Sequence, residues 1–255
     1  MATYKRRGFK PKNKAEEKEQ QNQESTTAEV FSTLDEGASR TEAWVSQNQN
    51  YILGFIGVVA VGVLGYLAYM QFVQKPKEAN AANEMYYPQQ YFDQALNTET
   101  AKDSLYNLAL DGAEGKYGFL DIIAEYPGTK AANLANYSAG MAYLNTQRYE
   151  EAIDYLEEFN SDDDILGALA KGALGDAFMQ LDQPQDALEY YEKAIAHSDN
   201  DYTSPKFLYK AGVTALEAGE GERALAFFQQ IKDKYSDSDQ ANAIDAFIGM
   251  AQNGK

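Results

Sequence analysis

The sequence predicts an all-α protein in which a single transmembrane helix is followed by an α-solenoid of helix-pair repeats. Three observations predict this fold. Residues 51–73 form an apolar stretch with no Asp, Glu, Lys, Arg or His. After residue 80, apolar side chains recur at the three- and four-residue spacing of a helix, without strand-like alternation. Within that region, three segments align at a nearly constant spacing, which is typical of a repeat protein.

The chain begins with a polar tail. Residues 1–29 are rich in Lys, Glu, Gln and Asn and contain very few large apolar side chains. Such a segment cannot bury enough apolar surface to offset the loss of chain entropy on folding. We therefore expect residues 1–50 to form a disordered cytoplasmic tail.

Residues 51–73 are the predicted membrane span. As a helix this stretch is roughly 34 Å long, which is enough to cross a hydrocarbon core of about 30 Å. A cleaved signal peptide is the alternative, because Ala79-Asn80-Ala81 has the small-residue spacing of a cleavage site. The apolar run, however, exceeds the roughly 7–15 residues of a signal-peptide core. The sequence therefore favours an uncleaved signal anchor.

Charge predicts the orientation of the anchor. The bias of Lys and Arg toward the cytoplasmic side predicts a cytoplasmic N-terminus and an external C-terminal domain. The whole formal net charge of −17 falls after residue 50. A domain so acidic repels polyanions, so nucleic acid is not expected as a partner. The basic residues near the start are Lys5, Arg6, Arg7, Lys10, Lys12, Lys14 and Lys18.

The predicted span carries small residues on one face. At 3.6 residues per turn they fall within a sector of about 80°. A face of small side chains allows another membrane helix to approach closely, although ordinary glycine usage in membrane helices is an equal alternative. The residues of this predicted contact face are Gly54, Gly57, Val61, Gly65 and Ala68.

The repeats are defined by small and large residues at matching positions in segments that start at Asn133, Ala168 and Pro205. Small residues on both helices of a pair let the helices approach closely, and the large residue is expected to fill the gap against the next repeat. The small residues are Gly140, Gly175 and Gly212 in the first helix and Ala152, Ala187 and Ala224 in the second; the large residues are Leu156, Tyr191 and Phe228.

This pattern resembles the tetratricopeptide repeat, whose small-residue positions are matched in all three segments. The resemblance implies a repeat domain over residues 80–255. Its expected parts are a degenerate unit at about 86–128, units at about 133–166, 168–201 and 205–238, and a capping helix at 239–252.

In this family the first helices of successive units line a groove that binds protein partners. A small side chain at Gly172 predicts that the middle of the groove is open. The alternative is that the chain's own flanking helix fills the groove. The positions that the resemblance places in the groove are Leu134, Tyr137, Met141, Leu144, Asp176, Met179, Lys206, Tyr209 and Val213.

The sequence shows no motif for catalysis. It contains no cysteine, which excludes zinc–thiolate and disulfide frameworks, and a single histidine, His197. We therefore expect no catalytic residues, no metal, no cofactor and no small-molecule substrate.

The complete arrangement, over residues 51–255, resembles the YfgM-type ancillary subunits of the bacterial SecYEG translocon. The features that carry this resemblance are the signal anchor, the acidic repeat domain and the Tyr126-Pro127-Gly128-Thr129 junction. The resemblance implies a single-pass protein of the bacterial inner membrane with a periplasmic domain. Its implied partners are Sec translocon subunits and a membrane-anchored chaperone or prolyl isomerase. A scaffold for another envelope assembly or secretion machine is the alternative.

Overall fold

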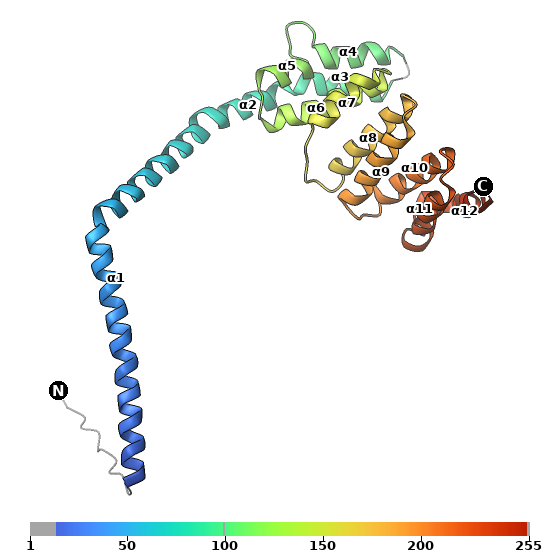
Figure 1. Cartoon of the computed structure of the whole chain (residues 1–255). Helices are drawn as coiled ribbons and strands as arrows, with labels where there is room; N and C mark the ends of the chain where they lie inside the picture. The colour runs from blue at the N-terminus through green and yellow to red at the C-terminus, as the bar shows by residue number, and fades with distance from the viewer. Residues whose placement is uncertain (1–13, 99, 254–255) are drawn as a thin grey trace, which may run out of the picture. The chain divides into compact units, whose positions relative to one another are not determined.

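The computed structural model describes the backbone of residues 14–98 and 100–253, and side chains from residue 42 onward (Figure 1). This part of the chain is helical and contains no strand. It divides into two compact units, one that ends at Tyr69 and one that begins at Met70.

The first unit is one helix, α1, over Lys14–Tyr69. The polar composition predicted disorder through residue 50, whereas the structure has helix from residue 14. Glu, Gln, Ala and Lys are good helix formers, and no proline occurs between Pro11 and Pro76 to interrupt the helix. The part of the predicted tail in residues 1–13 lies outside the described residues.

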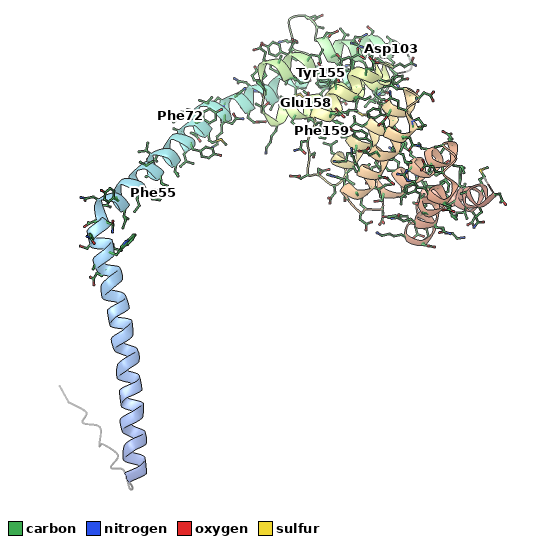
Figure 2. All side chains as sticks on the ribbon, viewed as in Figure 1. Phe55, Phe72, Asp103, Tyr155, Glu158 and Phe159 are labelled. Atoms are coloured by element: carbon green, nitrogen blue, oxygen red, sulfur yellow. The ribbon has the colours of Figure 1, made fainter. Side chains whose placement is uncertain are left out.

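The apolar stretch 51–73 exposes its side chains. Phe55 is 72% exposed and Phe72 is 78% exposed, and both project away from their helices (Figure 2). The last residues of the predicted span form a short π-helix over Met70–Gln74. Among the described residues, one helical stretch within Glu42–Leu96 is long and apolar enough to cross a membrane.

The second unit is a succession of antiparallel helices. In three hairpins, a first helix (α6, α8 or α10) pairs with a second helix (α7, α9 or α11), and each hairpin packs on the next. The helices are α2 Lys75–Glu84, α3 Tyr86–Leu96, α4 Lys102–Asp111, α5 Phe119–Glu125, α6 Lys130–Asn145, α7 Tyr149–Glu158, α8 Leu166–Gln180, α9 Pro184–His197, α10 Ser204–Glu217, α11 Gly221–Lys234 and α12 Ile244–Asn253.

The glycines of the first helices set the distance between the two helices of each hairpin. A Cβ atom at Gly175 would lie 2.5 Å from the Tyr191 ring. Equivalent contacts join Gly140 to Leu156, and Gly212 to Phe228. Each large residue therefore fills the space opposite the glycine of its own hairpin. The expected contact with the next repeat is present as well, since Tyr191 stacks on Phe207 of α10.

The segment before the first complete repeat contains three helices rather than two. Helices α3 and α4 form a hairpin, and α5 packs mainly on α6. Phe92 of α3 contacts Tyr106 and Phe119, with ring centroids 5.4 and 6.1 Å apart. The degenerate unit is thus three helices around a small aromatic core, and α4 and α5 pack on α6.

The C-terminal cap begins as a 3₁₀-helix over Asp239–Ala243 and continues as α12. Helix α12 packs on α11. Its Phe247 lies edge-on to Tyr209 at 5.1 Å and against Phe228 at 5.4 Å. The cap thereby covers the apolar side of the last hairpin.

The start of α6 is tied to α2. The Glu78 carboxylate accepts hydrogen bonds from the backbone N–H groups of Lys130 at 3.0 Å and Ala131 at 3.3 Å. The Thr129 hydroxyl accepts from Ala132 N–H at 3.1 Å. Lys77 Nζ donates to the Pro127 carbonyl at 2.8 Å. The free N–H groups at the helix start are thus satisfied, partly by a residue some fifty positions earlier in the chain.

Replacing Gly175 with Ala should destabilise the solenoid by about 1–3 kcal/mol, because the new methyl group overlaps the Tyr191 ring. The control is Gly249→Ala in α12, where an added Cβ meets nothing within 4 Å. The control should be neutral or stabilise by about 0.5–1 kcal/mol. Thermal melting of both full-length variants measures the difference, and equal melting temperatures would contradict the proposed close approach.

Replacing Glu78 with Ala should destabilise the second unit by about 1 kcal/mol, since it removes a charged acceptor from a helix start. Asn80→Ala, on an exposed position of the same helix, is the matched control and should have little effect. Hydrogen exchange at Lys130 and Ala131 provides a local readout. Unchanged exchange in Glu78→Ala would show that the carboxylate does not cap α6.

Candidate functional site

A pocket of about 570 Å³ lies along the first helices of the three complete repeats; we call it the first-helix pocket. Helices α6, α8 and α10 supply most of its walls. It combines apolar side chains with tyrosines and a few charged groups, as expected of a protein-binding groove. Its lining residues are Leu144, Tyr149, Asp176, Met179, Gln180, Tyr191, Tyr209, Lys210, Val213 and Glu217.

Five of the nine predicted groove residues line this pocket. They come from three different helices, and the repeat register brings them together. They are Leu144 of α6, Asp176 and Met179 of α8, and Tyr209 and Val213 of α10.

The other four predicted residues lie outside the pocket. Tyr137 packs on Phe159, with ring centroids 5.2 Å apart, and burial raises the pKa of its phenol. Met141 joins Tyr137 in the small core between the first two hairpins. Leu134 packs on the core of the preceding helices. Lys206 is half-buried, with its ammonium 5.7 Å from the Phe207 ring.

The space at Gly172 is not open. A Cβ atom there would lie 1.8 Å from the Phe207 ring of α10, so that ring occupies the place of the missing side chain. The prediction of an open middle was wrong because a large residue from the next repeat fills the gap. Phe207 is 1% exposed, and it also stacks on Tyr191 at 6.4 Å.

A half-buried ion pair crosses the first-helix pocket from α8 to α10. Lys210 Nζ lies 2.5 and 2.6 Å from the two oxygens of Asp176. The Tyr191 hydroxyl donates to Asp176 Oδ1 at 2.7 Å. Burial raises the pKa of the Tyr191 phenol and the Asp176 carboxylate raises it further, so the hydroxyl keeps its proton and remains a donor.

Sequence reasoning missed half of the pocket lining. The repeat pattern predicts only a packing role for Tyr191, yet its hydroxyl donates to Asp176 in the pocket. Lys210 follows Asp176 by 34 residues, which is about one repeat. The repeat length alone could therefore have predicted that the two side chains are neighbours. Tyr149 and Gln180, joined by a 3.2 Å hydrogen bond, lie at helix ends that the family positions do not cover.

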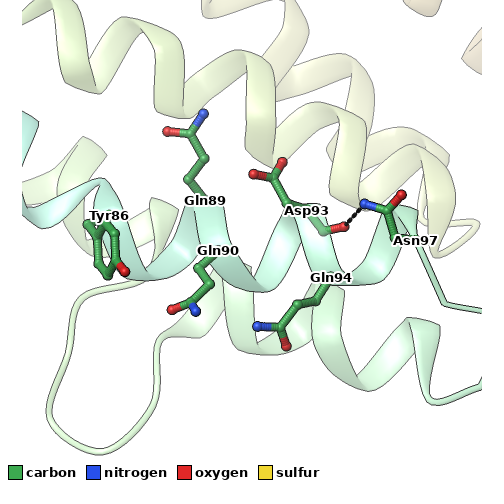
Figure 3. A pocket seen from close by; sticks show the side chains of 6 residues that line it. All are labelled: Tyr86, Gln89, Gln90, Asp93, Gln94 and Asn97. Carbon is green, nitrogen blue, oxygen red and sulfur yellow. Dashed lines mark hydrogen bonds between the residues drawn. The ribbon is translucent and has the colours of Figure 1, made fainter.

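A second hollow, of about 540 Å³, lies beside α3 (Figure 3). All of its lining side chains come from this helix and Asn97 directly after it. Figure 3 shows Gln89 and Asp93 on one side of the ribbon and Gln90 and Gln94 on the other. At 3.6 residues per turn these six positions fall on one face of α3. No other element contributes to the lining, so the hollow is a polar stripe on a single helix and not a site built by several helices.

Within the described residues, no group of three His, Asp or Glu side chains could hold a metal ion. His197, at the end of α9, is instead half-buried against α8 and the loop before it. Its Nε2 lies 3.0 Å from the Asp163 carbonyl oxygen, and its Nδ1 lies 3.1 Å from Lys171 Nζ. These contacts give the only histidine of the sequence a packing role.

The predicted contact face of the apolar helix is exposed throughout. A Cβ atom at Gly54, Gly57 or Gly65 would meet nothing within 4 Å. Val61 and Ala68, the two other residues of that face, are exposed as well.

The Asp176–Lys210 pair should show a coupling of about 1 kcal/mol in a double-mutant cycle with Asp176→Asn and Lys210→Met, because both side chains are about one-third exposed. The control pair is Lys232–Asp245, whose side chains are 53% and 78% exposed. Its coupling should be about 0.3 kcal/mol. Urea unfolding gives both coupling free energies. A value no larger than that of the control would show that the Asp176–Lys210 pair is not held in a fixed geometry.

Comparisons with known proteins agree with this geometry. Residues 135–160 and residues 173–239 each match a family model of the tetratricopeptide repeat. No curated protein sequence matches the chain.

Two solved structures share the fold. Both are nearly identical tetratricopeptide-like repeats from Podosopora anserina. They have TM-scores of 0.50 with 13% and 12% identity, and each alignment covers 69% of this chain and 87% of the other. At this identity the similarity concerns the fold alone. The chain therefore carries tetratricopeptide repeats, a protein–protein interaction scaffold that is typically non-catalytic.

Proposed function

We propose that this chain is a membrane-anchored scaffold whose first-helix pocket binds a segment of a partner protein. One observation carries the proposal: Leu144, Met179 and Val213, from three successive repeats, line one pocket together with polar groups that can fix orientation.

Membrane anchoring is supported by the apolar stretch at residues 51–73 and the exposure of its side chains. The contacts of α2 favour an uncleaved anchor over a cleaved signal peptide. Cleavage after Ala81 would remove Lys77 and Glu78, which bind the start of α6. A shortened chain would lose this cap, so the intact helix serves the repeat domain as well as the anchor.

We place the repeats in the periplasm of a bacterium, with the N-terminus in the cytoplasm. The support is the basic cluster near the start of the sequence and the resemblance to YfgM-type subunits. On this proposal the chain is an accessory factor of the Sec translocon that links it to a membrane-anchored chaperone or prolyl isomerase. A scaffold for another envelope assembly or secretion machine would use the same pocket, and the identity of the copurifying proteins separates the two.

The cysteine-free sequence allows a direct test of topology. A single cysteine introduced as Glu222→Cys should react with a membrane-impermeant maleimide in spheroplasts. Ser25→Cys should react only after the membrane is permeabilised. The opposite labelling pattern would contradict the periplasmic assignment.

Partner binding should depend on the pocket. Met179→Ala and Val213→Ala together should weaken binding by about tenfold, since apolar anchors carry most of the energy of such interfaces. Ile195→Ala is the control, because Ile195 packs against the same core but does not line the pocket. Copurification of the full-length variants in mild detergent measures the effect, after melting curves establish that both the double variant and the control fold. Retention of partners by the double variant would exclude the pocket as their docking site.

A further inference from the structure

The first-helix pocket offers two kinds of contact side by side. Leu144, Met179 and Val213 provide an apolar wall. Beside it, the Asp176–Lys210 pair retains unused hydrogen-bonding capacity. An ammonium group has three donors, and two of those of Lys210 are directed at Asp176.

Among the described residues the third N–H of Lys210 has no acceptor, so the ion pair presents a donor next to carboxylate lone pairs. An extended polypeptide exposes a C=O and an N–H on its main chain at each residue. Lys210 can donate to such a carbonyl and Asp176 can accept from such an amide. This type of contact selects an extended segment without specifying its side chains, and the apolar wall then selects one large apolar side chain.

The net charge around the pocket also restricts the kind of partner that can bind. Residues 130–253 contain 22 acidic and nine basic side chains. Six of the nine basic residues form ion pairs with carboxylates, which leaves the excess charge negative. Glu217, an exposed lining residue of the pocket, has no ion-pair partner among the described residues. The field at the pocket entrance thus attracts cations.

We propose that the occupant of the first-helix pocket is an extended, positively charged segment of a protein partner. One large apolar side chain of this segment enters between Leu144, Met179 and Val213, and its flanking Lys or Arg side chains lie near Glu217. The inference rests on the proposed function and adds the chemistry of the partner to it.

The test uses the full-length protein in a neutral detergent and short fluorescent peptides. The probe alternates lysine with leucine. One control peptide has glutamate in place of lysine, and the other has serine in place of leucine. Fluorescence anisotropy should show the lysine–leucine peptide binding about tenfold or more tightly than either control. Equal binding of the glutamate peptide or the serine peptide would overturn the inference.

A pair of variants separates the pocket from the general acidity of the domain. Glu217→Lys and Glu222→Lys change the net charge equally, but Glu222 lies on the second helix α11, outside the pocket lining. Glu217→Lys should weaken the lysine–leucine peptide by about fivefold and Glu222→Lys by less than about twofold. Equal losses in the two variants would overturn the assignment to the pocket.

The two proposals fail separately. If proteins copurify in a manner that requires Met179 and Val213 but the peptides show no preference for lysine, only the partner chemistry is wrong. If no copurifying protein depends on those residues, the proposed function fails, whatever the peptides bind.

Discussion

The close approach of paired helices at Gly140, Gly175 and Gly212 is the constraint on which the rest of the solenoid depends. With a side chain at these positions, Leu156, Tyr191 and Phe228 would have to move, since an added Cβ would lie within about 2.5 Å of each. Tyr191, which packs on Gly175 inside its hairpin, also donates to Asp176, and Asp176 pairs with Lys210 on the next first helix. Tyr191 therefore links the packing inside its hairpin to the polar contacts of the pocket.

A second constraint operates at the start of the repeats. Helix α2 supplies Glu78 and Lys77 to the Pro127–Ala131 junction, so the residues after the apolar stretch belong to the repeat domain and are not a free linker. Helix α2 begins at Lys75, directly after the π-helix Met70–Gln74.

The periodic features of the fold were predictable from the sequence. The filling of space in one repeat by a side chain of the next repeat was not. Small residues at fixed spacing predicted the three hairpins, because close approach leaves no other choice at those positions. The register likewise brought five predicted residues into one pocket. Gly172 was misjudged because nothing in its own repeat indicates that Phe207 fills the gap. Tyr137 and Met141 follow the groove pattern but pack between hairpins, since α7 and α8 close over them. Residues 14–50 are helical although they are polar, because Glu, Gln, Ala and Lys favour the helix and polarity alone does not exclude it.

Hydrogen exchange of the full-length protein, measured with and without its copurified partner, tests the central claim most directly. If the pocket is the docking site, binding should slow exchange in α6, α8 and α10 around Leu144, Met179 and Val213, and leave the second helices α7, α9 and α11 nearly unchanged. Protection confined to α7, α9 and α11, or to the apolar stretch at residues 51–73, would contradict the account.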